Sequence, residues 1–308
     1  MSDIYDLAIL GGGPAGITAA IYASRARLNT IWIDKNFAPG GQVTATYAVD
    51  NYPGMPGISG MDLGDAFGEH ARKLGLEPQR EKILSLENIS GEIKTIRTKK
   101  HEYQAKTLIL AFGAEHRKLD IPGEDDLGGL GVSYCATCDG AFFRGRTVAV
   151  VGGGDVALED AIYLARTCEK VYLIHRRDSL RGAMVLQEEL KSLPNVEILY
   201  DHVVTEICGE DMVEKLRIKN VKTEAEKDLE AAGIFIAVGI HPNTELLREL
   251  VAVGEDGYIP ADETGETGRP GIYVAGDIRK KPLRQVVTAV ADGANAAVSA
   301  GNYCNRFR

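Results

Sequence analysis

Two stretches of the chain repeat one pattern of apolar and polar positions. Residues 6–26 read DLAILGGGPAGITAAIYASRA, and residues 147–167 read TVAVVGGGDVALEDAIYLART. Each begins with an apolar run without polar alternation, which is typical of a strand buried on both faces of a parallel sheet. A glycine-rich turn and an alanine-rich helix follow, and a second apolar strand comes next at residues 30–34 and 170–175. The pattern therefore predicts two separate βαβ folds in one chain.

The segments around these copies read as short strands and crossovers. Residues 81–112 alternate polar and apolar positions and end in another buried strand, and residues 196–232 resemble short antiparallel strands. Residues 113–126 (GAEHRKLDIPGEDD) and 239–243 (GIHPN) bring Gly, Pro and polar residues together, which favours connecting segments. These two connections predict that the chain leaves the first fold and later returns to it.

The last part of the chain predicts the completion of the first fold. It contains GIYVAGD at residues 271–277 and a helix near residues 285–303. We therefore predict an α/β protein of two Rossmann-like, three-layer domains, with the second inserted into the first. Residues 1–115 and 244–308 would form the first domain, and residues 116–243 the inserted one.

Composition and charge narrow the class of protein. The chain has 308 residues, 44% of them hydrophobic and 26% charged, which suits a globular protein with more than one core. Its apolar runs are much shorter than a membrane span. The net charge of −9 argues against a nucleic-acid partner, because phosphate backbones are held by basic surfaces. The N-terminus lacks the features of a secretory signal, so we expect a cytoplasmic protein.

The first glycine turn has the spacing of a dinucleotide fingerprint. Gly11, Gly13 and Gly16 follow a predicted strand and open a helix, whose positive end suits a diphosphate. Asp34 ends the next strand about 20 residues further on, where a carboxylate accepts hydrogen bonds from a ribose. The alternative is a glycine turn that serves packing alone. This motif by itself does not separate FAD from NAD.

Later loops favour FAD for the first domain. PGGQ at residues 39–42 and DNYPG at residues 50–54 are glycine-rich loops that suit close approach by a bulky ring. The strand at residues 271–277 ends in Gly276-Asp277, where a carboxylate could bind a polyhydroxyl chain such as the ribityl of FAD. Each feature alone is commonly only a turn. The prediction of FAD therefore rests on the occurrence of all these features in this order in one chain.

The second glycine turn predicts an NADPH site. Gly152, Gly154 and Ala157 repeat the fingerprint, but the next strand ends in HRRDSLR at residues 175–181 rather than in an acid. Arginine at this place pairs with the 2′-phosphate of NADPH. A solvated basic surface run is the alternative interpretation. The predicted phosphate ligands are Arg176, Arg177 and Arg181.

Cys135-Ala-Thr-Cys138-Asp139 lies just before the second fold and predicts redox chemistry. The spacing puts both sulfurs on one face of a helical turn, and a helix N-terminus favours a thiolate. Asp139 is a candidate acid or base for moving protons, although a plain helix-turn acid is the alternative. A zinc site needs four ligands, and the remaining cysteines are isolated, so we expect no metal. Those cysteines are Cys168, Cys208 and Cys304.

With these motifs in this order, the chain resembles the bacterial-type, low-molecular-weight thioredoxin reductases over essentially its full length. The resemblance implies non-covalent FAD, NADPH in the inserted domain, a homodimer, a thioredoxin-like partner and two alternating domain orientations. It also implies that Cys138 is nearer the flavin and that Cys135 attacks the partner. At position 112 the family usually has a small hydroxyl residue, whereas this chain has Phe112. The contact expected between this position and the flavin therefore differs from that of the family, but the expected function does not.

The resemblance carries a set of site residues onto this sequence. The expected FAD residues are Gly11, Gly13, Pro14, Ala15, Gly16, Asp34, Lys35, Gly40, Gly41, Gln42, Asn51, Gly113, Gly276, Asp277, Arg284, Gln285, Val286 and Ala289. The expected NADPH residues are Gly152, Gly154, Asp155, Ala157, His175, Arg176, Arg177 and Arg181. The residues expected to dock the partner are Phe142, Phe143 and Arg144, for which core packing is the alternative.

Other functions remain open at this point. A related flavoprotein could oxidise a small dithiol or take electrons from ferredoxin, but neither needs an arginine clamp for a 2′-phosphate. A flavin reductase in which the cysteine pair is structural is a second alternative, and a binding module without activity is a third. The sequence therefore favours a thioredoxin-disulfide reductase.

Overall fold

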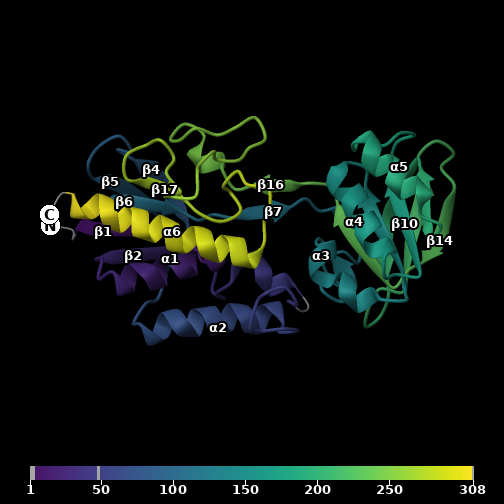
Figure 1. The fold of residues 1–308 in the computed structure, drawn as a ribbon, viewed down its shortest axis with the longest axis horizontal. Coiled ribbons are helices and arrows are strands. Elements are labelled where there is room, and N and C mark those ends of the chain that lie inside the picture. The colour runs from purple at the N-terminus through teal and green to yellow at the C-terminus, as the bar shows by residue number, and fades with distance from the viewer. Residues whose placement is uncertain (1–3, 47–48, 307–308) are drawn as a thin grey trace. The chain divides into compact units, whose positions relative to one another are not determined.

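The structure, a computed structural model, describes residues 4–46 and 49–306. The chain forms two compact units, each with its own hydrophobic core (Figure 1). The sequence placed the boundaries after residues 115 and 243; the structure places them after Glu115 and Ile240 and groups residues 45–58 with the inserted unit. Unit 1 comprises Met1–Thr44, Ser59–Glu115 and His241–Arg308, and unit 2 comprises Ala45–Ile58 and His116–Ile240.

Unit 1 is built on one large sheet. Its strands are β1 (Ile4–Leu10), β2 (Thr30–Asp34), β3 (Gln79–Arg80), β4 (Ile83–Glu87), β5 (Lys94–Thr98), β6 (Glu102–Leu110) and β17 (Ile272–Val274). β1 pairs in parallel with β2 and with β6, and β17 returns from the end of the chain to pair with β6. β5 and β4 extend the sheet as antiparallel strands. The continuous apolar runs of β1 and β6 are buried because helices and loops cover both faces.

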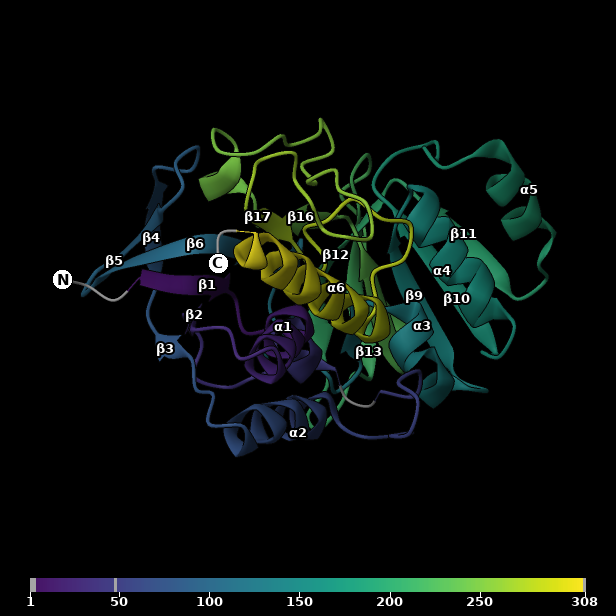
Figure 2. The same cartoon turned by 60° about the vertical axis from the view of Figure 1, so that its left-hand side comes forward.

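The helices of unit 1 pack through small residues. They are α1 (Pro14–Arg25), α2 (Gly60–Lys73), α6 (Val286–Asn305) and the short η1 (Gly41–Ala45) and η3 (Glu245–Leu247). α1 and α6 lie side by side in both views (Figure 2). A Cβ atom on Gly293 of α6 would lie 2.1 Å from the Ala15 carbonyl oxygen. Glycine and alanine are therefore needed where these helices approach each other.

Unit 2 repeats the parallel arrangement. Its main sheet contains, in spatial order, β11 (Val196–Tyr200), β10 (Lys170–His175), β9 (Thr147–Gly152), β15 (Gly233–Ala237) and β8 (Val132–Ser133). An antiparallel sheet adds β12 (His202–Cys208), β13 (Lys215–Asn220) and β14 (Glu226–Glu230). The helical segments are α3 (Ala136–Asp139), η2 (Gly140–Phe143), α4 (Asp155–Ala165) and α5 (Met184–Ser192).

The two connecting segments form short strands of their own. β7 (Ala114–His116) and β16 (Ile240–Pro242) pair with each other in a two-stranded sheet. Two backbone hydrogen bonds flank the pair, from Arg117 to Gly239 and from Asn243 to Gly113. Within the described residues, no helix is long and apolar enough to cross a lipid bilayer.

Candidate redox and nucleotide sites

The three glycines of the first turn have different roles in the structure. Gly11 has φ +124°, in the region that favours glycine, and a Cβ there would overlap the Ala111 carbonyl. A Cβ on Gly16 would lie 2.0 Å from the Gly11 carbonyl oxygen, so Gly16 allows α1 to approach the strand. Gly13 precedes α1 and has no atom within 4 Å of its Cβ position. The backbone at Gly13 is therefore open to a diphosphate at the helix N-terminus.

Asp34 lies beside this turn at the end of β2. Its carboxylate is buried, and burial raises its pKa above the ordinary value although Arg80, 3.9 Å away, acts in the opposite direction. The loop that carries Gly40 and Gly41 folds back on the turn, because the Gly40 N–H donates to the Gly12 carbonyl at 3.1 Å. Unit 1 thus brings the predicted ribose acid, the predicted diphosphate turn and the predicted ring loop together.

Two buried atoms near the start of α6 lack a hydrogen-bond partner. Asp277 Oδ1 is an acceptor, and Arg284 Nε is a donor. The Arg284 guanidinium stacks on the Tyr258 ring at 3.8 Å, and Lys281 Nζ is 3.7 Å from Asp277 Oδ1. Burial raises the pKa of Asp277. Orphaned buried polar atoms are rare in folded proteins, so this pair fits a ligand that offers both a hydroxyl group and an acceptor.

Asp292 fixes the turn that carries Asp277, and sequence reasoning did not single it out. This buried carboxylate of α6 accepts from the Gly276 N–H at 3.0 Å and pairs with Arg279 at 2.8 Å and Lys281 at 2.9 Å. The only feature of the sequence that could have indicated a role for Asp292 is its position as an acid within an apolar helix. At the N-terminus of the same helix, Thr288 Oγ1 accepts from the Gln285 N–H at 3.1 Å.

The cysteine pair is a disulfide in unit 2. Cys135 and Cys138 are bonded through their sulfur atoms, and Cys135 is the residue that precedes α3. Asp139 ends α3 and is 9% exposed, and its Oδ1 is buried without a partner. Its Oδ2 accepts a hydrogen bond from Ser133, a residue that sequence reasoning missed. Burial raises the pKa of Asp139 to about 6, although the Ser133 hydroxyl acts to lower it.

The second glycine turn repeats the geometry of the first. Gly154 precedes α4 and has no atom within 4 Å of its Cβ position, as at Gly13. A Cβ on Gly152 would lie 2.5 Å from the Cβ of Ala157, so this position brings strand and helix together. The backbone beside Gly154 is thus open to a second diphosphate.

The loop after β10 folds over this turn. The Arg181 N–H donates to the Gly153 carbonyl at 2.7 Å, and Asp155 Oδ1 accepts from the Ala183 N–H at 2.7 Å. His175 is buried against Gly153 and contacts the Ser179 carbonyl at 3.0 Å, so it orients the loop from within. The side chains of the three predicted phosphate ligands are exposed, and none forms an ion pair with another described residue. These ligands are Arg176, Arg177 and Arg181.

The matching family model is that of the pyridine nucleotide-disulphide oxidoreductases, over residues 5–293. A thioredoxin reductase of Bacillus subtilis is 44% identical over 307 residues, which cover 99% of this chain and 96% of that protein. The chain belongs to the pyridine nucleotide-disulphide oxidoreductase family. Among solved structures, a thioredoxin reductase from Streptococcus pyogenes has 43% identity and a TM-score of 0.95, with complete coverage of both chains. A ferredoxin-flavin thioredoxin reductase from Clostridium acetobutylicum has 35% identity and a TM-score of 0.53, covering 98% of each chain.

Membership in the family confirms the predicted fold of two Rossmann-type domains. Unit 1 also holds predicted FAD residues that are partly exposed, such as Lys35, which pairs with Glu115 at 3.9 Å. Asn51 is grouped with unit 2, so it is not among the FAD residues that unit 1 brings together. Phe112 packs against the unit 1 core, and its carbonyl accepts from Asn243 at 3.1 Å.

One predicted docking residue needs correction. Phe143 is 7% exposed, and its ring packs edge-on against Phe235 with a centroid distance of 5.3 Å. The oxidoreductase fold therefore uses Phe143 as core, because Gly233 leaves the space that its ring fills. Phe142 and Arg144 are exposed and stay in the predicted docking set.

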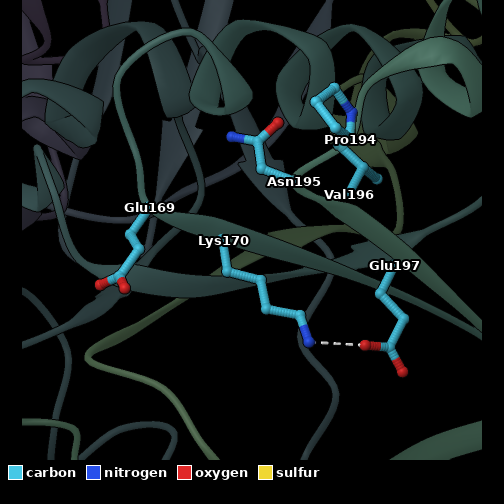
Figure 3. A pocket seen from close by; sticks show the side chains of 6 residues that line it. All are labelled: Glu169, Lys170, Pro194, Asn195, Val196 and Glu197. Carbon is cyan, nitrogen blue, oxygen red and sulfur yellow. Dashed lines mark ion pairs between the residues drawn. The ribbon is translucent and has the colours of Figure 1, made fainter.

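Two hollows on the surface of unit 2 lie away from these sites. One of about 530 Å³ lies where β10 and β11 begin, and Lys170 pairs with Glu197 beside it at 2.7 Å (Figure 3). Parallel sheets bind nucleotides at the carboxyl ends of their strands, which is the opposite edge. We therefore assign no nucleotide to this hollow.

Proposed function

We propose that the chain is an NADPH-dependent thioredoxin-disulfide reductase that passes electrons through FAD and the Cys135–Cys138 disulfide. The observation that carries the proposal is this disulfide, which lies one residue from a buried acid with an orphaned oxygen. It is supported by full-length relatives named thioredoxin reductase. The chemistry of the pair is thiol–disulfide exchange.

Unit 2 would hold NADPH at its second glycine turn. The open backbone at Gly154 would take the diphosphate, and the exposed arginines of the following loop would pair with the 2′-phosphate. Asp155 and His175 keep that loop over the turn through the contacts described above. A phosphate clamp of this kind favours NADPH over NADH.

Unit 1 fits FAD by its own polar atoms. Gly13 offers an open backbone for the diphosphate, Asp34 a carboxylate for the ribose, and Asp277 Oδ1 an acceptor for a ribityl hydroxyl. Arg284 Nε supplies a buried donor to the same ligand. Held by these residues, FAD would supply the redox chemistry that links hydride transfer from NADPH to reduction of the Cys135–Cys138 disulfide. Asp292 keeps the Asp277 turn in place for this task.

The cysteine pair then reduces the partner in two exchanges. The Cys135 thiolate attacks one sulfur of the partner disulfide and forms a mixed disulfide, while the other partner sulfur leaves as a thiolate. The Cys138 thiolate attacks Cys135, releases the second partner thiolate and restores the Cys135–Cys138 bond. Asp139 moves a proton to or from these sulfurs. The net reaction consumes NADPH, one proton and a protein disulfide, and it yields NADP⁺ and a dithiol.

The partner and the setting follow from the same proposal. We assign a thioredoxin-like partner that docks near Phe142 and Arg144, a homodimer and a cytoplasmic location. The two units would alternate between an arrangement for hydride transfer and one for disulfide reduction.

Replacing Cys138 by Ser tests the pathway. The rate of thioredoxin reduction should fall by about 1,000-fold or more in this variant, because thiol–disulfide exchange needs both sulfurs. NADPH should still bleach the flavin absorbance. Cys208→Ser, which removes an isolated thiol of β12, should leave both measurements unchanged. Turnover with thioredoxin in the Cys138 variant would contradict the pathway.

A ferredoxin-linked reductase is the alternative that one comparison favours, because such a protein is among the structural relatives. It predicts that NADPH alone forms no thiols. Titration of the holoenzyme before and after stoichiometric NADPH separates the two functions, since only the first predicts two new thiols per chain.

A further inference from the structure

A single buried hydroxyl contacts both ends of the redox motif. Ser133 ends β8 and is 5% exposed. Its Oγ accepts a hydrogen bond from the Cys135 N–H at 3.1 Å and donates one to Asp139 Oδ2 at 2.5 Å. One hydroxyl can do both at once, because it has one donor proton and two lone pairs. Ser133 thus connects the first cysteine to the acid that follows the second.

The Asp139 carboxylate depends on this hydroxyl. Among the described residues, Ser133 is the only side chain that donates to it, and Asp139 Oδ1 is buried without a partner. A buried carboxylate needs hydrogen bonds to keep its charge. Removing the hydroxyl therefore favours the neutral acid.

In the part of the chain that the structure describes, no neighbouring charge takes over that role. η2 and β15, which adjoin α3 and β8, contain only Gly, Ala, Ile and Phe, so neither contributes a titratable side chain. On α4, the Tyr163 ring lies near Gly140, and Asp160 precedes it by one helical turn. The pKa of Asp139 nevertheless has two causes, burial that raises it and the Ser133 bond that lowers it. Of the residues with a described structure, Ser133 alone offsets the effect of burial on the pKa of Asp139.

We propose that Ser133 is a positioning residue of the redox centre, which fixes Asp139 beside the cysteine pair and sets the pH at which Asp139 exchanges a proton with the sulfurs. This inference rests on the proposed function, in which Asp139 is the acid. The Cys135–Cys138 bond takes up the two electrons that NADPH supplies and breaks, which leaves two thiolates. Asp139 gives a proton to one of them and solvent gives a proton to the other; the hydrogen that NADPH transfers as hydride is released as a proton, so one proton is consumed overall. The carboxylate that remains is the form that the Ser133 hydroxyl stabilises.

The test measures how fast thiols form in the holoenzyme after mixing with NADPH, as a function of pH. The rate of thiol formation should fall as the pH rises and Asp139 loses its proton; we call this decrease the alkaline fall. Loss of a hydrogen bond to the charged form raises the pKa of Asp139, so in Ser133→Ala the alkaline fall should occur about one pH unit higher. Ser133→Thr keeps a hydroxyl and should restore the wild-type profile. Ser192→Ala, which removes an exposed serine hydroxyl bond from α5, is the matched control. Superimposable profiles for Ser133→Ala and wild type would overturn the proposal.

Asp139→Asn separates this inference from the proposed function. If Asp139 is the acid, the variant loses the alkaline fall, and adding Ser133→Ala changes the profile no further. A profile unchanged by Asp139→Asn would refute the acid role itself. A shift by Ser133→Ala in the Asn background would show that Ser133 acts through another group, which also overturns the inference. Should the Ala variant fail to fold, Ser133→Val, which has the shape of Thr and suits a strand, removes the same hydroxyl and repeats the test.

Discussion

At the scale of single residues, unsatisfied polar atoms mark the sites. Three buried side-chain atoms lack a hydrogen-bond partner among the described residues, on Asp139, Asp277 and Arg284. A buried polar atom without a partner costs about 1–3 kcal/mol, so a fold without ligands has no reason to keep it. The sequence motifs had predicted Asp139 and Asp277 as site residues, and the family resemblance had implied Arg284. Motif and geometry therefore point to the same places by independent arguments.

The arginine clamp gives a prediction at this scale. Replacing Arg176 and Arg177 together by Ala should raise KM for NADPH by more than about tenfold, because each guanidinium–phosphate bond contributes about 1.5–3 kcal/mol. KM for NADH should change little, since NADH has no 2′-phosphate. Arg166→Ala at the other end of α4 is the control. Equal changes for both nucleotides would remove the assignment of these arginines.

At the scale of elements, each strand–turn–helix contains glycines that pack closely and one that stays open. Gly16 and Gly152 bring helix and strand together, whereas Gly13 and Gly154 leave space at the helix N-terminus. The fingerprint spacing therefore serves stability and binding at different positions. Glycine is required for a steric reason at the first kind of site and for access at the second.

Two alanine substitutions in one turn should separate these effects. Gly16→Ala should lower the free energy of unfolding by about 1–3 kcal/mol, because its Cβ meets the Gly11 carbonyl. Gly13→Ala should lower it by less than about 1 kcal/mol, yet should weaken FAD binding because its Cβ occupies the open space. Urea unfolding and FAD titration of the apoprotein measure both quantities. Similar losses of stability for the two variants would contradict this division.

At the scale of the whole molecule, the chain has two units with separate cores. The clusters around Ile9 and Ile33 belong to unit 1, and those around Ile234 and Phe235 belong to unit 2. Each unit carries one glycine fingerprint of its own. A ligand of one fingerprint should therefore stabilise the unit that binds it.

Hydrogen exchange along the whole chain tests whether NADP⁺ stabilises only the unit that binds it. NADP⁺ at 100 times its Kd stabilises the state that binds it by about 2.7 kcal/mol. We expect the added protection in β9, α4 and β10 and not in β1, α1 and β2. Equal protection of both fingerprints would show that NADP⁺ is not confined to unit 2.

The sequence alone predicted the two βαβ folds and the insertion, and its motifs indicated which residues to test for binding and redox chemistry. Strand burial, glycine turns and the Cys-x-x-Cys spacing are local patterns, and local backbone geometry follows from them. Tertiary structure decided which side chains meet. Phe143 looked like a docking residue until the ring of Phe235 was found against it, and Ser133 and Asp292 gained their roles only through hydrogen bonds to Asp139 and Gly276. Periodicity shows which face a residue is on, but packing alone selects its partner.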